Sequence, residues 1–395
     1  MNEVTLGIIC EINPRKPQGL DPESECSFIP MDHVDDYFGL VSKMSVRRVS
    51  EVENGYTFFQ DGDVLFAKIT PCMENGKCAI ARNLVNRIGF GSTEFHVVRA
   101  RGSVIPEWIY YYLRQESVRK KAEQSMTGSA GQRRVPSKFL EEALIPLPPL
   151  PEQQRIAAML AKADRLRRLR RTACELSDTY LQSVFVHLFG DPGVNPHKWD
   201  IAPVERALSR RGTQTGPFGS SLKRNEYVKQ GIPVWGIDNV RENKFTEQGS
   251  LFITPAKYHQ LSRYTVEDGD ILVSRAGTVG RMCVAHPTQS PSIIGTNLVR
   301  VAVDTSAILP EYFTALFTYF SDRIESMSSG GTAYSFVNPR TLKLLKIPIP
   351  PITLQQQFAH IVHKFEHLRA QQREAERQAE HLFQSLLQRA FRGGL

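Results

Sequence analysis

The stretch Pro146-Leu147-Pro148-Pro149-Leu150-Pro151-Glu152-Gln153-Gln154 decides the fold, because a related stretch occurs again later in the chain. The second form is Pro348-Ile349-Pro350-Pro351-Ile352-Thr353-Leu354-Gln355-Gln356-Gln357. Each form follows a short apolar strand pattern and opens a long charged run with the apolar spacing of a helix. A globular segment precedes each form, so the sequence indicates a tandem duplication.

Four further matches occur in the same order in both halves, which is how an internal repeat is recognised. They join Asp61-Gly62-Asp63-Val64-Leu65 to Asp268-Gly269-Asp270-Ile271-Leu272, Gly91-Ser92-Thr93 to Gly295-Thr296-Asn297, Ile105-Pro106-Glu107-Trp108 to Leu309-Pro310-Glu311-Tyr312, and Ile145-Pro146 to Ile347-Pro348. The separations are 207, 204, 204 and 202 residues. This small drift is what short loop deletions give, so each copy is predicted to be a whole domain followed by a helix.

The globular segments have the patterns of strands, turns and short helices. The apolar run Val64–Ala67 follows a D-G-D turn, Phe95–Arg99 alternates as a strand does, and Gly231–Trp235 also has a strand pattern. A helix with proline in its first turn is predicted to begin at Pro106 and to continue to about Gln124. The first half has no segment like Trp199-Asp200-Ile201, so we expect its N-terminal edge to be shorter.

Two long amphipathic helices are predicted, one after each proline stretch. The first runs from Pro151 to about Phe189, roughly 60 Å at ~1.5 Å per residue. Its predicted apolar stripe is Leu166, Leu169, Ala173, Leu176, Tyr180, Val184 and Leu188, extended backwards by Ile156, Met159 and Ala163. The predicted stripe of the second helix is Leu354, Phe358, Ile361, Phe365, Leu368, Ala375, Ala379, Leu382 and Leu386. We expect the helices to be antiparallel partners, although each could instead pack on its own domain or on another chain.

Two local features of these helices are also predicted. Thr353 and Gln356 have the spacing of a capping box at the start of the second helix. The arginines that flank Leu166 and Leu169 are interpreted as a solvated flank or a docking face; they are Arg165, Arg167, Arg168, Arg170 and Arg171.

Composition fits a globular protein with two cores, since 41% of the 395 residues are hydrophobic and 23% are charged. No apolar run reaches the eighteen residues that a membrane helix needs, and the first residues lack a secretory pattern. Six scattered cysteines suit reduced thiols, so we expect a cytoplasmic location. A net charge of +8 favours an anionic partner, nucleic acid first.

Motifs of common catalytic sites are missing. The sequence has no P-loop, no G-x-G-x-x-G between a strand and a helix, no G-x-S-x-G and no Asn/Asp-Pro-Pro-aromatic tetrapeptide of amino-methyltransferases. Cys72 and Cys78 lack a second pair, and the spaced histidines of the last helix alternate with apolar residues, so no metal site is predicted. The aspartates of both D-G-D turns are interpreted as turn residues that hydrogen-bond the backbone.

Polar and basic loops remain as candidates for nucleic-acid contact, because such side chains bind phosphates and read base edges. In the first half they follow the predicted strand that begins at Val64, lie in the repeated Gly91-Ser92-Thr93, or follow the Gly/Ser-rich loop of residues 127–132. They are Lys68, Thr70, Glu74, Asn75, Lys77, Ser92, Arg133 and Arg134. In the second half they lie in or after the glycine loop of residues 216–221, at or after the predicted strand that begins at Ile271, or in the repeated Gly295-Thr296-Asn297. They are Ser220, Lys223, Arg224, Ser274, Arg275, Thr278 and Thr296. Ordinary solvated loops are the alternative.

These residues resemble a known family. The repeated proline–glutamine stretches, each followed by a long helix, resemble the specificity subunit of type I restriction-modification enzymes. Lys68–Lys77 and Gly89–Phe95 are similar to one class of its target-recognition domains, and Gly216–Lys223 resembles the opening loop of another. The second stretch departs from the first at Leu354, where the first has Glu152.

The resemblance implies an α+β fold with two pseudo-repeated target-recognition domains of mixed β-sheet and helices, separated by two long antiparallel coiled-coil helices. It predicts recognition domains at 1–150 and 192–351 and spacer helices at 151–191 and 352–395. It implies a non-catalytic chain that reads an asymmetric, bipartite double-stranded DNA site and docks two methyltransferase subunits and motor-nuclease subunits. S-adenosylmethionine, ATP and Mg²⁺ would belong to those partners, and this chain would bind no cofactor.

Three alternatives stay open at this point. The chain could serve a fused or solitary methylation system. It could be a DNA-processing nuclease with a site made of Asp63, Glu74 and Lys77. It could also be a coiled-coil scaffold that recognises no bases.

Overall fold

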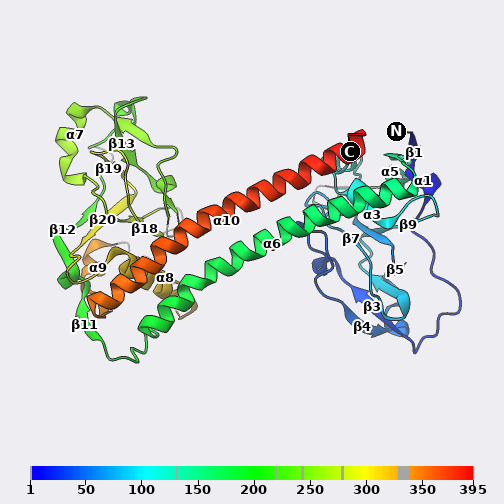
Figure 1. Ribbon diagram of the computed structural model, residues 1–395, viewed down its shortest axis with the longest axis horizontal. Helices are drawn as coiled ribbons and strands as arrows, with labels where there is room; N and C mark the ends of the chain where they lie inside the picture. The colour runs from blue at the N-terminus through cyan, green and yellow to red at the C-terminus, as the bar shows by residue number, and fades with distance from the viewer. Residues whose placement is uncertain are drawn as a thin grey trace. The chain divides into compact units, whose positions relative to one another are not determined.

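The computed structural model comprises two compact units, one of residues 1–173 and 372–395 and the other of residues 174–371. It describes residues 2–129, 131–218, 221–241, 244–276, 280–327 and 338–394, with the backbone alone for 178, 179 and 320–327. Figure 1 labels the elements. The two units divide both long helices, because each helix contributes one segment to each unit.

In the residues that the structure describes, the first unit contains ten strands and five short helices before the first long helix. Its strands are β1 Glu3–Thr5, β2 Cys10–Ile12, β3 Glu25–Ile29, β4 Ser45–Arg48, β5 Thr57–Gln60, β6 Val64–Ala67, β7 Cys78–Ile80, β8 Ile88–Gly91, β9 Phe95–Ala100 and β10 Leu144–Pro146. Its short helices are α1 Leu6–Ile9, α2 Val49–Val52, α3 Pro106–Leu113, α4 Glu116–Gln124 and α5 Ser137–Glu142.

The second unit repeats most of this order in the part of the chain that is described. Its strands are β11 Asp200–Pro203, β12 Leu208–Thr215, β13 Ile232–Trp235, β14 Val240–Arg241, β15 Lys244–Phe245, β16 Leu251–Ile253, β17 Ile271–Ser274, β18 Met282–Val284, β19 Ile293–Ile294, β20 Leu298–Val303 and β21 Lys346–Ile349. Its short helices are α7 Pro255–Leu261, α8 Pro310–Met327 and α9 Pro339–Leu344, and the long helices are α6 Leu150–Phe189 and α10 Ile352–Arg392.

Sheet topology confirms the duplication. The first unit has a sheet of order β2-β9-β6-β7, and the second unit has the equivalent sheet of order β12-β20-β17-β18. A second sheet in each unit contains a parallel pair, β3 with β8 and β13 with β19. The first strand pairs antiparallel with the strand before the proline stretch in both units, β1 with β10 and β11 with β21. The chain is therefore an α+β duplication with mixed sheets. The first strand of the first unit, β1, has three residues, and its counterpart β11 has four.

The buried glutamines of the proline stretches explain why these stretches occur twice. Gln153 is fully buried; its Oε1 accepts from Ile105 N at 3.1 Å, and its Nε2 donates to Ser103 O and Pro148 O. Gln355 makes the same set of bonds, with Leu309 N at 2.8 Å and with Ala307 O and Pro350 O. Each glutamine thus fastens the start of a long helix to the loop before α3 or α8.

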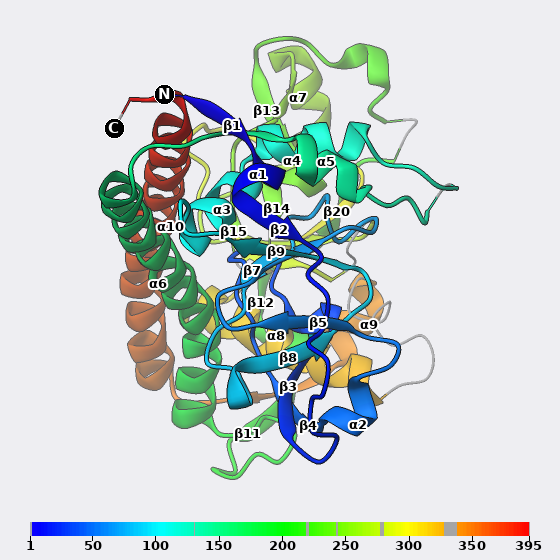
Figure 2. The ribbon, with the colours of Figure 1, turned by 90° about the vertical axis from the view of Figure 1, so that its right-hand side faces the viewer.

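Within each unit, the segments of α6 and α10 lie side by side and antiparallel (Figures 1 and 2). In the second unit, Tyr180 contacts Phe365 and Phe189 contacts Phe358, at ring-centroid distances of 5.0 and 5.4 Å. In the first unit, Phe391 near the end of α10 packs on Trp108 of α3, with the ring centroids 4.4 Å apart. The expected antiparallel pairing within one chain is confirmed.

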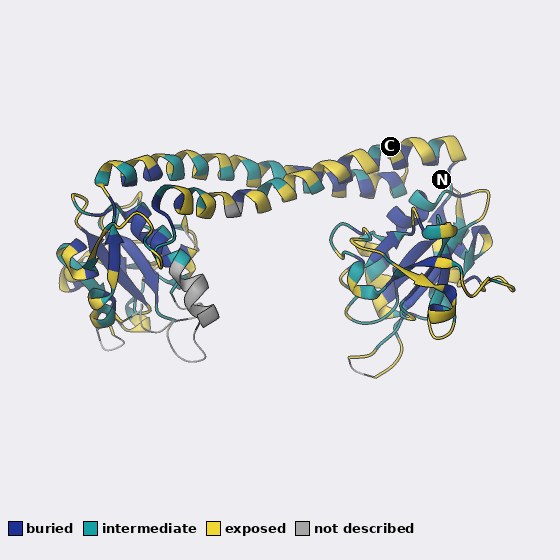
Figure 3. Cartoon of the chain, turned by 90° about the horizontal axis from the view of Figure 1, so that it is seen from below, coloured by how far each residue is buried: buried dark blue, intermediate teal, exposed yellow. Residues whose placement is uncertain are grey.

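The predicted apolar stripe of α6 is partly wrong: Ile156 and Ala163 are buried as predicted, but several leucines further along the helix are exposed. Leu166, Leu169 and Leu176 have exposed fractions of 39%, 58% and 67%, whereas the buried positions of α6 are Gln153, Ile156, Ala157, Leu160, Ala163, Asp164, Arg167, Ser177, Phe185 and Phe189. Arg167 is buried and does not lie on a solvated flank as predicted. Polar residues occupy the middle of this seam, so a search for apolar spacing alone selects the neighbouring leucines. Figure 3 shows exposed positions recurring along both helices.

Two helix boundaries differ from the sequence predictions. Helix α10 begins at Ile352, where Pro351 O accepts from Leu354 N and Gln355 N, so the predicted Thr353 capping box is wrong. The helix predicted from Pro106 to Gln124 is broken between α3 and α4, because Gln115 has an extended backbone. No helix in the described part of the chain is long and apolar enough to cross a membrane.

Candidate nucleic-acid interface

Three loops of the first unit meet at the end of β6. Lys68 N donates to Glu94 O at 2.9 Å, and Val135 N donates to Lys68 O at 2.9 Å. Thr70 N donates to Arg133 O at 3.0 Å. These backbone bonds bring together residues 68–77, 92–94, 127–129 and 131–135, which carry all eight candidate residues of the first half.

Ion pairs hold the arginines of this cluster in place. Arg134 makes a forked contact with Glu94 through Nε at 2.9 Å and Nη2 at 2.8 Å. Hydrogen bonds from Arg134 lower the pKa of Glu94, so this carboxylate stays ionised. Arg133 pairs with Glu74 at 3.1 Å, and Thr70 Oγ1 donates to the same carboxylate at 3.0 Å. A bidentate pair fixes the guanidinium plane, so Arg134 is held in one orientation.

The other candidates of this unit differ in what their side chains do. Asn75 is exposed. Lys77 is half-buried, and its Nζ donates to Met31 O at 2.9 Å. Ser92 Oγ accepts from Glu94 N at 3.2 Å and therefore supports the turn before β9. The side chain of Asn75 is exposed, whereas those of Lys77 and Ser92 each bond a backbone group.

A buried histidine lies beneath the cluster. The exposed fraction of His96 is 5%, and its Nε2 lies 2.8 Å from Val135 O. Its Nδ1 lies 3.1 Å from Asn13 Nδ2, while Asn13 Oδ1 accepts from Val97 N. This network assigns the imidazole as neutral, donating through Nε2 and accepting through Nδ1. Burial, followed by the charge of Lys68, lowers the pKa of His96, and the bond to Val135 O opposes this shift.

The second unit builds the equivalent corner from other side chains. Arg275 N donates to Asn297 O at 2.8 Å, and this bond is equivalent to the one from Lys68 N to Glu94 O in the first unit. Leu298 N donates to Gly295 O, as Phe95 N does to Ser92 O. Lys68 therefore corresponds to Arg275 and Glu94 to Asn297. Equivalent residues just before β9 and β20 are thus 203 residues apart, with Gly295 in the place of Ser92. The sequence match of Gly91 with Gly295 gave a separation of 204 residues.

The remaining described candidates of the second half are placed differently. Ser274 is buried, and its Oγ accepts from Arg281 N at 3.1 Å, so its side chain supports the end of β17. Thr296 is half-buried, and Lys223 and Arg224 are exposed. Lys223 N donates to Glu226 Oε2 at 2.6 Å at the start of a short 3-10 turn. Ser220 and Thr278 lie outside the described residues.

Gly216 brings the glycine loop to the same corner. Its N donates to Leu298 O at 2.9 Å, and a Cβ added there would lie 1.8 Å from Gly295 O. No side chain fits between these two backbones, so glycine is required by close approach. Sequence reasoning missed Gly295, Glu94 and Asn297 as parts of the site; their only signal was their position just before matched strands.

The aspartates of the D-G-D turns are structural, as predicted. Asp63 accepts from Gln60 N at 2.7 Å and pairs with Arg99 at 2.7 Å. Asp270 accepts from Glu267 N at 2.7 Å and pairs with Arg211 at 2.9 Å. The geometry does not favour a nuclease site on Asp63 and Glu74, because an arginine already occupies each carboxylate.

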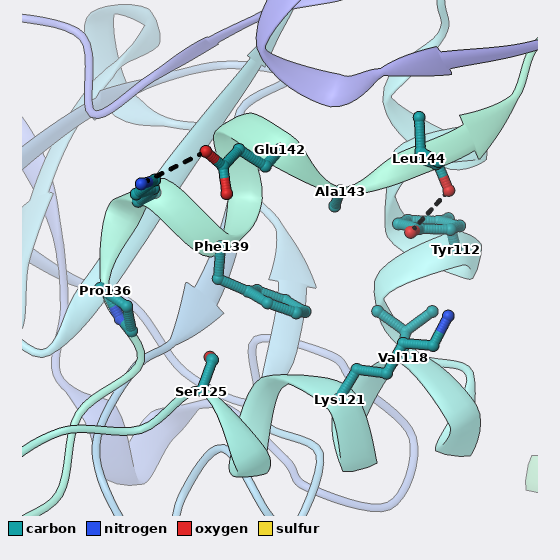
Figure 4. A pocket seen from close by; sticks show the side chains of 10 residues that line it. Tyr112, Val118, Lys121, Ser125, Pro136, Phe139, Glu142, Ala143 and Leu144 are labelled. Carbon is teal, nitrogen blue, oxygen red and sulfur yellow. Dashed lines mark hydrogen bonds and ion pairs between the residues drawn. The ribbon is translucent and has the colours of Figure 1, made fainter.

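A pocket of about 540 Å³ lies elsewhere in the first unit, between α4, α5 and β10 (Figure 4). Phe139 and Val118 line it, and Lys138 pairs with Glu142 at its edge at 3.5 Å. None of the candidate residues lines this pocket, so it is separate from the loop cluster.

The chain is similar in sequence to known proteins. A family model described as type I restriction modification DNA specificity domain matches residues 1–173 and 218–379. The chain is 26% identical over 458 residues to the type I restriction enzyme EcoEI specificity subunit of Escherichia coli, covering 92% of this chain and 77% of that protein. It is 45% identical over 153 residues to the EcoAI specificity subunit of Escherichia coli, covering 38% of this chain and 26% of that protein.

The fold also has a counterpart among solved structures. A structure described as the basis of complex assembly and conformational transition of the type I R-M system has a TM-score of 0.59 and 21% identity. The alignment covers 100% of this chain and 98% of that one. At this identity, the likeness concerns the fold.

Proposed function

The chain belongs to the type I restriction-modification specificity family, and from this premise we propose that each unit reads one half of a split, asymmetric DNA target. The described candidates of the first unit are Lys68, Thr70, Glu74, Asn75, Lys77, Ser92, Arg133 and Arg134. Those of the second unit are Lys223, Arg224, Ser274, Arg275 and Thr296. Among them, the exposed and half-buried polar groups would contact DNA, and buried Ser274 would support the loop.

The equivalence of Lys68 and Arg275 is the observation that carries this proposal. Lys68 follows β6 and Arg275 follows β17, which are equivalent strands, and each residue makes the equivalent backbone bond. The fold therefore places a basic residue at the same position in both units. The side chains at this corner differ, however, with Lys68 and Glu94 in one unit and Arg275 and Asn297 in the other. Since hydrogen-bonding side chains select bases, the two units would read different sequences.

The chain would act as a non-catalytic subunit in a cytoplasmic complex. Methyltransferase subunits would add S-adenosylmethionine chemistry, and motor-nuclease subunits would use ATP and Mg²⁺. The exposed leucines on the long helices would offer apolar side chains on which these subunits dock. These are Leu166, Leu169, Leu176, Leu368 and Leu382, with exposed fractions between 39% and 67%.

A map of modified bases tests this function. DNA from cells that express the chain with its methyltransferase is compared with DNA from cells that express the methyltransferase alone. We expect methylated adenine at one split motif with unequal halves, lost when the chain is absent. An identical map in both cells would overturn the proposed role in methylation targeting.

A contact test then separates base readers from phosphate contacts. Lys68→Ala and Arg275→Ala are each compared with the unaltered complex on DNA that carries the mapped motif. A phosphate contact would reduce the salt dependence of binding by about one charge, since counterion release scales with the phosphates neutralised. A base contact would relax discrimination at one position by ~1–3 kcal/mol.

A further inference from the structure

Arg167 of α6 joins three separate segments of the first unit. The exposed fraction of its side chain is 3%, and its Nε donates to Asp164 Oδ1 at 2.6 Å on the same helix. Its Nη1 donates to Glu380 Oε2 of α10 at 3.1 Å. Its Nη2 donates to Tyr37 O at 3.2 Å, in a loop between β3 and β4. One buried guanidinium thus binds both long helices and the globular part of this unit.

The Tyr37 loop completes this network. Tyr37 Oη donates to Glu380 Oε2 at 2.7 Å, and its ring lies 5.1 Å from the Arg167 guanidinium. Arg171, one turn further along α6, lies 4.4 Å from the same ring. Phe38 O accepts from Tyr110 Oη of α3 at 2.9 Å. The loop is therefore fastened to α6, α10 and α3 at once.

The second unit has an acidic residue and an arginine at the equivalent positions, but they are less buried than Asp164 and Arg167. Positions 202 residues after Asp164 and Arg167 hold Glu366 and Arg369, which is the separation that joins Gln153 to Gln355. Glu366 is exposed, and Arg369 is half-buried. A fully buried arginine at this position is thus a feature of the first unit.

We propose that Arg167, Glu380 and Tyr37 form a positioning cluster that fixes the orientation of the first recognition domain on the long helices. The cluster would thereby fix the number of unspecific base pairs between the two half-sites. This inference rests on the proposed function, because a spacer exists only if the chain reads a split target.

Directional bonds are the physical reason for this assignment. Apolar packing is non-directional and tolerates small rotations of one surface over another. A buried charge, in contrast, must keep its partners in place, since breaking one contact leaves an uncompensated ion. Polar groups buried in a helix seam are also the best-attested means of specifying register.

The experiment uses two variants in the assembled methyltransferase complex. Tyr37→Phe removes only the hydroxyl that binds Glu380, and Arg167→Met removes the guanidinium while keeping a long side chain. Lys120→Met is the matched control, because Lys120 loses a surface ion pair with Glu116 in the same unit, with both side chains about two-thirds exposed. Modified-base maps are then sorted by the spacer length of each methylated motif.

The expected result is unchanged half-sites and a relaxed spacer. For Tyr37→Phe, methylation at sites one base pair longer or shorter should rise roughly tenfold relative to the correct spacer, the effect of losing one hydrogen bond to a charged group. Arg167→Met should relax the spacer further, and Lys120→Met should keep one spacer. A single spacer in Tyr37→Phe overturns the inference even if Arg167→Met fails to fold. Absence of any split motif in the unaltered complex would instead overturn the proposed function.

Discussion

At the scale of single residues, the two units repeat backbone contacts and change side chains. Lys68 and Arg275 each donate one backbone hydrogen bond, and the two bonds occupy equivalent places in the two units. Gln153 and Gln355 each make three side-chain hydrogen bonds, to equivalent partners. All partners of these glutamines are main-chain atoms. The helix start can therefore be fastened to a domain whose surface side chains differ, which is what a pair of domains with different specificities requires.

The first prediction concerns Gln153. Gln153→Ala removes three hydrogen bonds and leaves Ile105 N–H without its acceptor. We expect the free energy of unfolding to fall by about 2–4 kcal/mol, because an unsatisfied buried group costs ~1–3 kcal/mol. Urea denaturation measures this change. Gln154→Ala is the matched control, since Gln154 is exposed and should alter stability by less than about 0.5 kcal/mol. Equal effects of the two variants would contradict the fastening role.

The second prediction concerns pH and His96. Burial lowers the pKa of His96 below its ordinary value of 6.5, so the folded state resists protonation that the unfolded state accepts. The contribution of neutral His96 to the free energy of unfolding is therefore fully present above pH 6.5. It is lost as the pH falls from there towards the lowered pKa of the folded state. The melting temperature should therefore drop between about pH 7.5 and about pH 5.5.

His96→Gln tests the origin of this drop. Glutamine has a donor and an acceptor but does not titrate, so the difference in melting temperature between the two pH values should shrink. The comparison uses differences within each protein, since the substitution also alters stability at neutral pH. An unchanged difference would assign the acid sensitivity to other groups.

At the scale of elements, the strands were predictable and the helix seam was not. Val64–Ala67 is β6 as predicted, because a buried run after a D-G-D turn has few other conformations. The seam of α6 includes Asp164 and Arg167, whose burial depends on partners in α10 and in the Tyr37 loop. Local spacing holds no information about such distant partners, so it predicts the stripe of Leu166, Leu169 and Leu176 instead.

The candidate site shows the same limit. The candidate loops of the first unit lie together as a group, because residues that follow strands gather at a sheet edge. Glu94 was missed, although its carboxylate holds Arg134. Ser274 was chosen although its side chain is buried. Which side chain points outward depends on the last turn of each loop, and residue type alone does not fix it.

The third prediction concerns the exposed leucines of α6. Leu169→Ser should weaken binding of methyltransferase subunits roughly tenfold to a hundredfold, because burying one leucine contributes ~1.5–3 kcal/mol. The stability of the free chain should change little, as the exposed fraction of Leu169 is 58%. Titration of the purified subunits measures the affinity. Lys162→Ser on the exposed part of the same helix is the control, and equal affinities of the two variants would argue against docking at Leu169.

At the scale of the whole molecule, the chain is one fold used twice. Equivalent sheets, equivalent first strands and equivalent glutamines occur in both units. The division into recognition domains 1–150 and 192–351 and spacer helices 151–191 and 352–395 stays a prediction about function. Each unit builds its own candidate surface from its own loops, so specificity should be modular.

Replacement of one recognition domain tests this modularity most directly. Residues 1–149 are exchanged for the corresponding domain of another family member, which keeps the Gln153 fastening because its contacts are to main-chain atoms and β10 remains with its partner β1. Methylated motifs are mapped before and after the exchange in cells with the same methyltransferase. We expect one half of the motif to change while the other half stays. A change in both halves, or in neither, would contradict it.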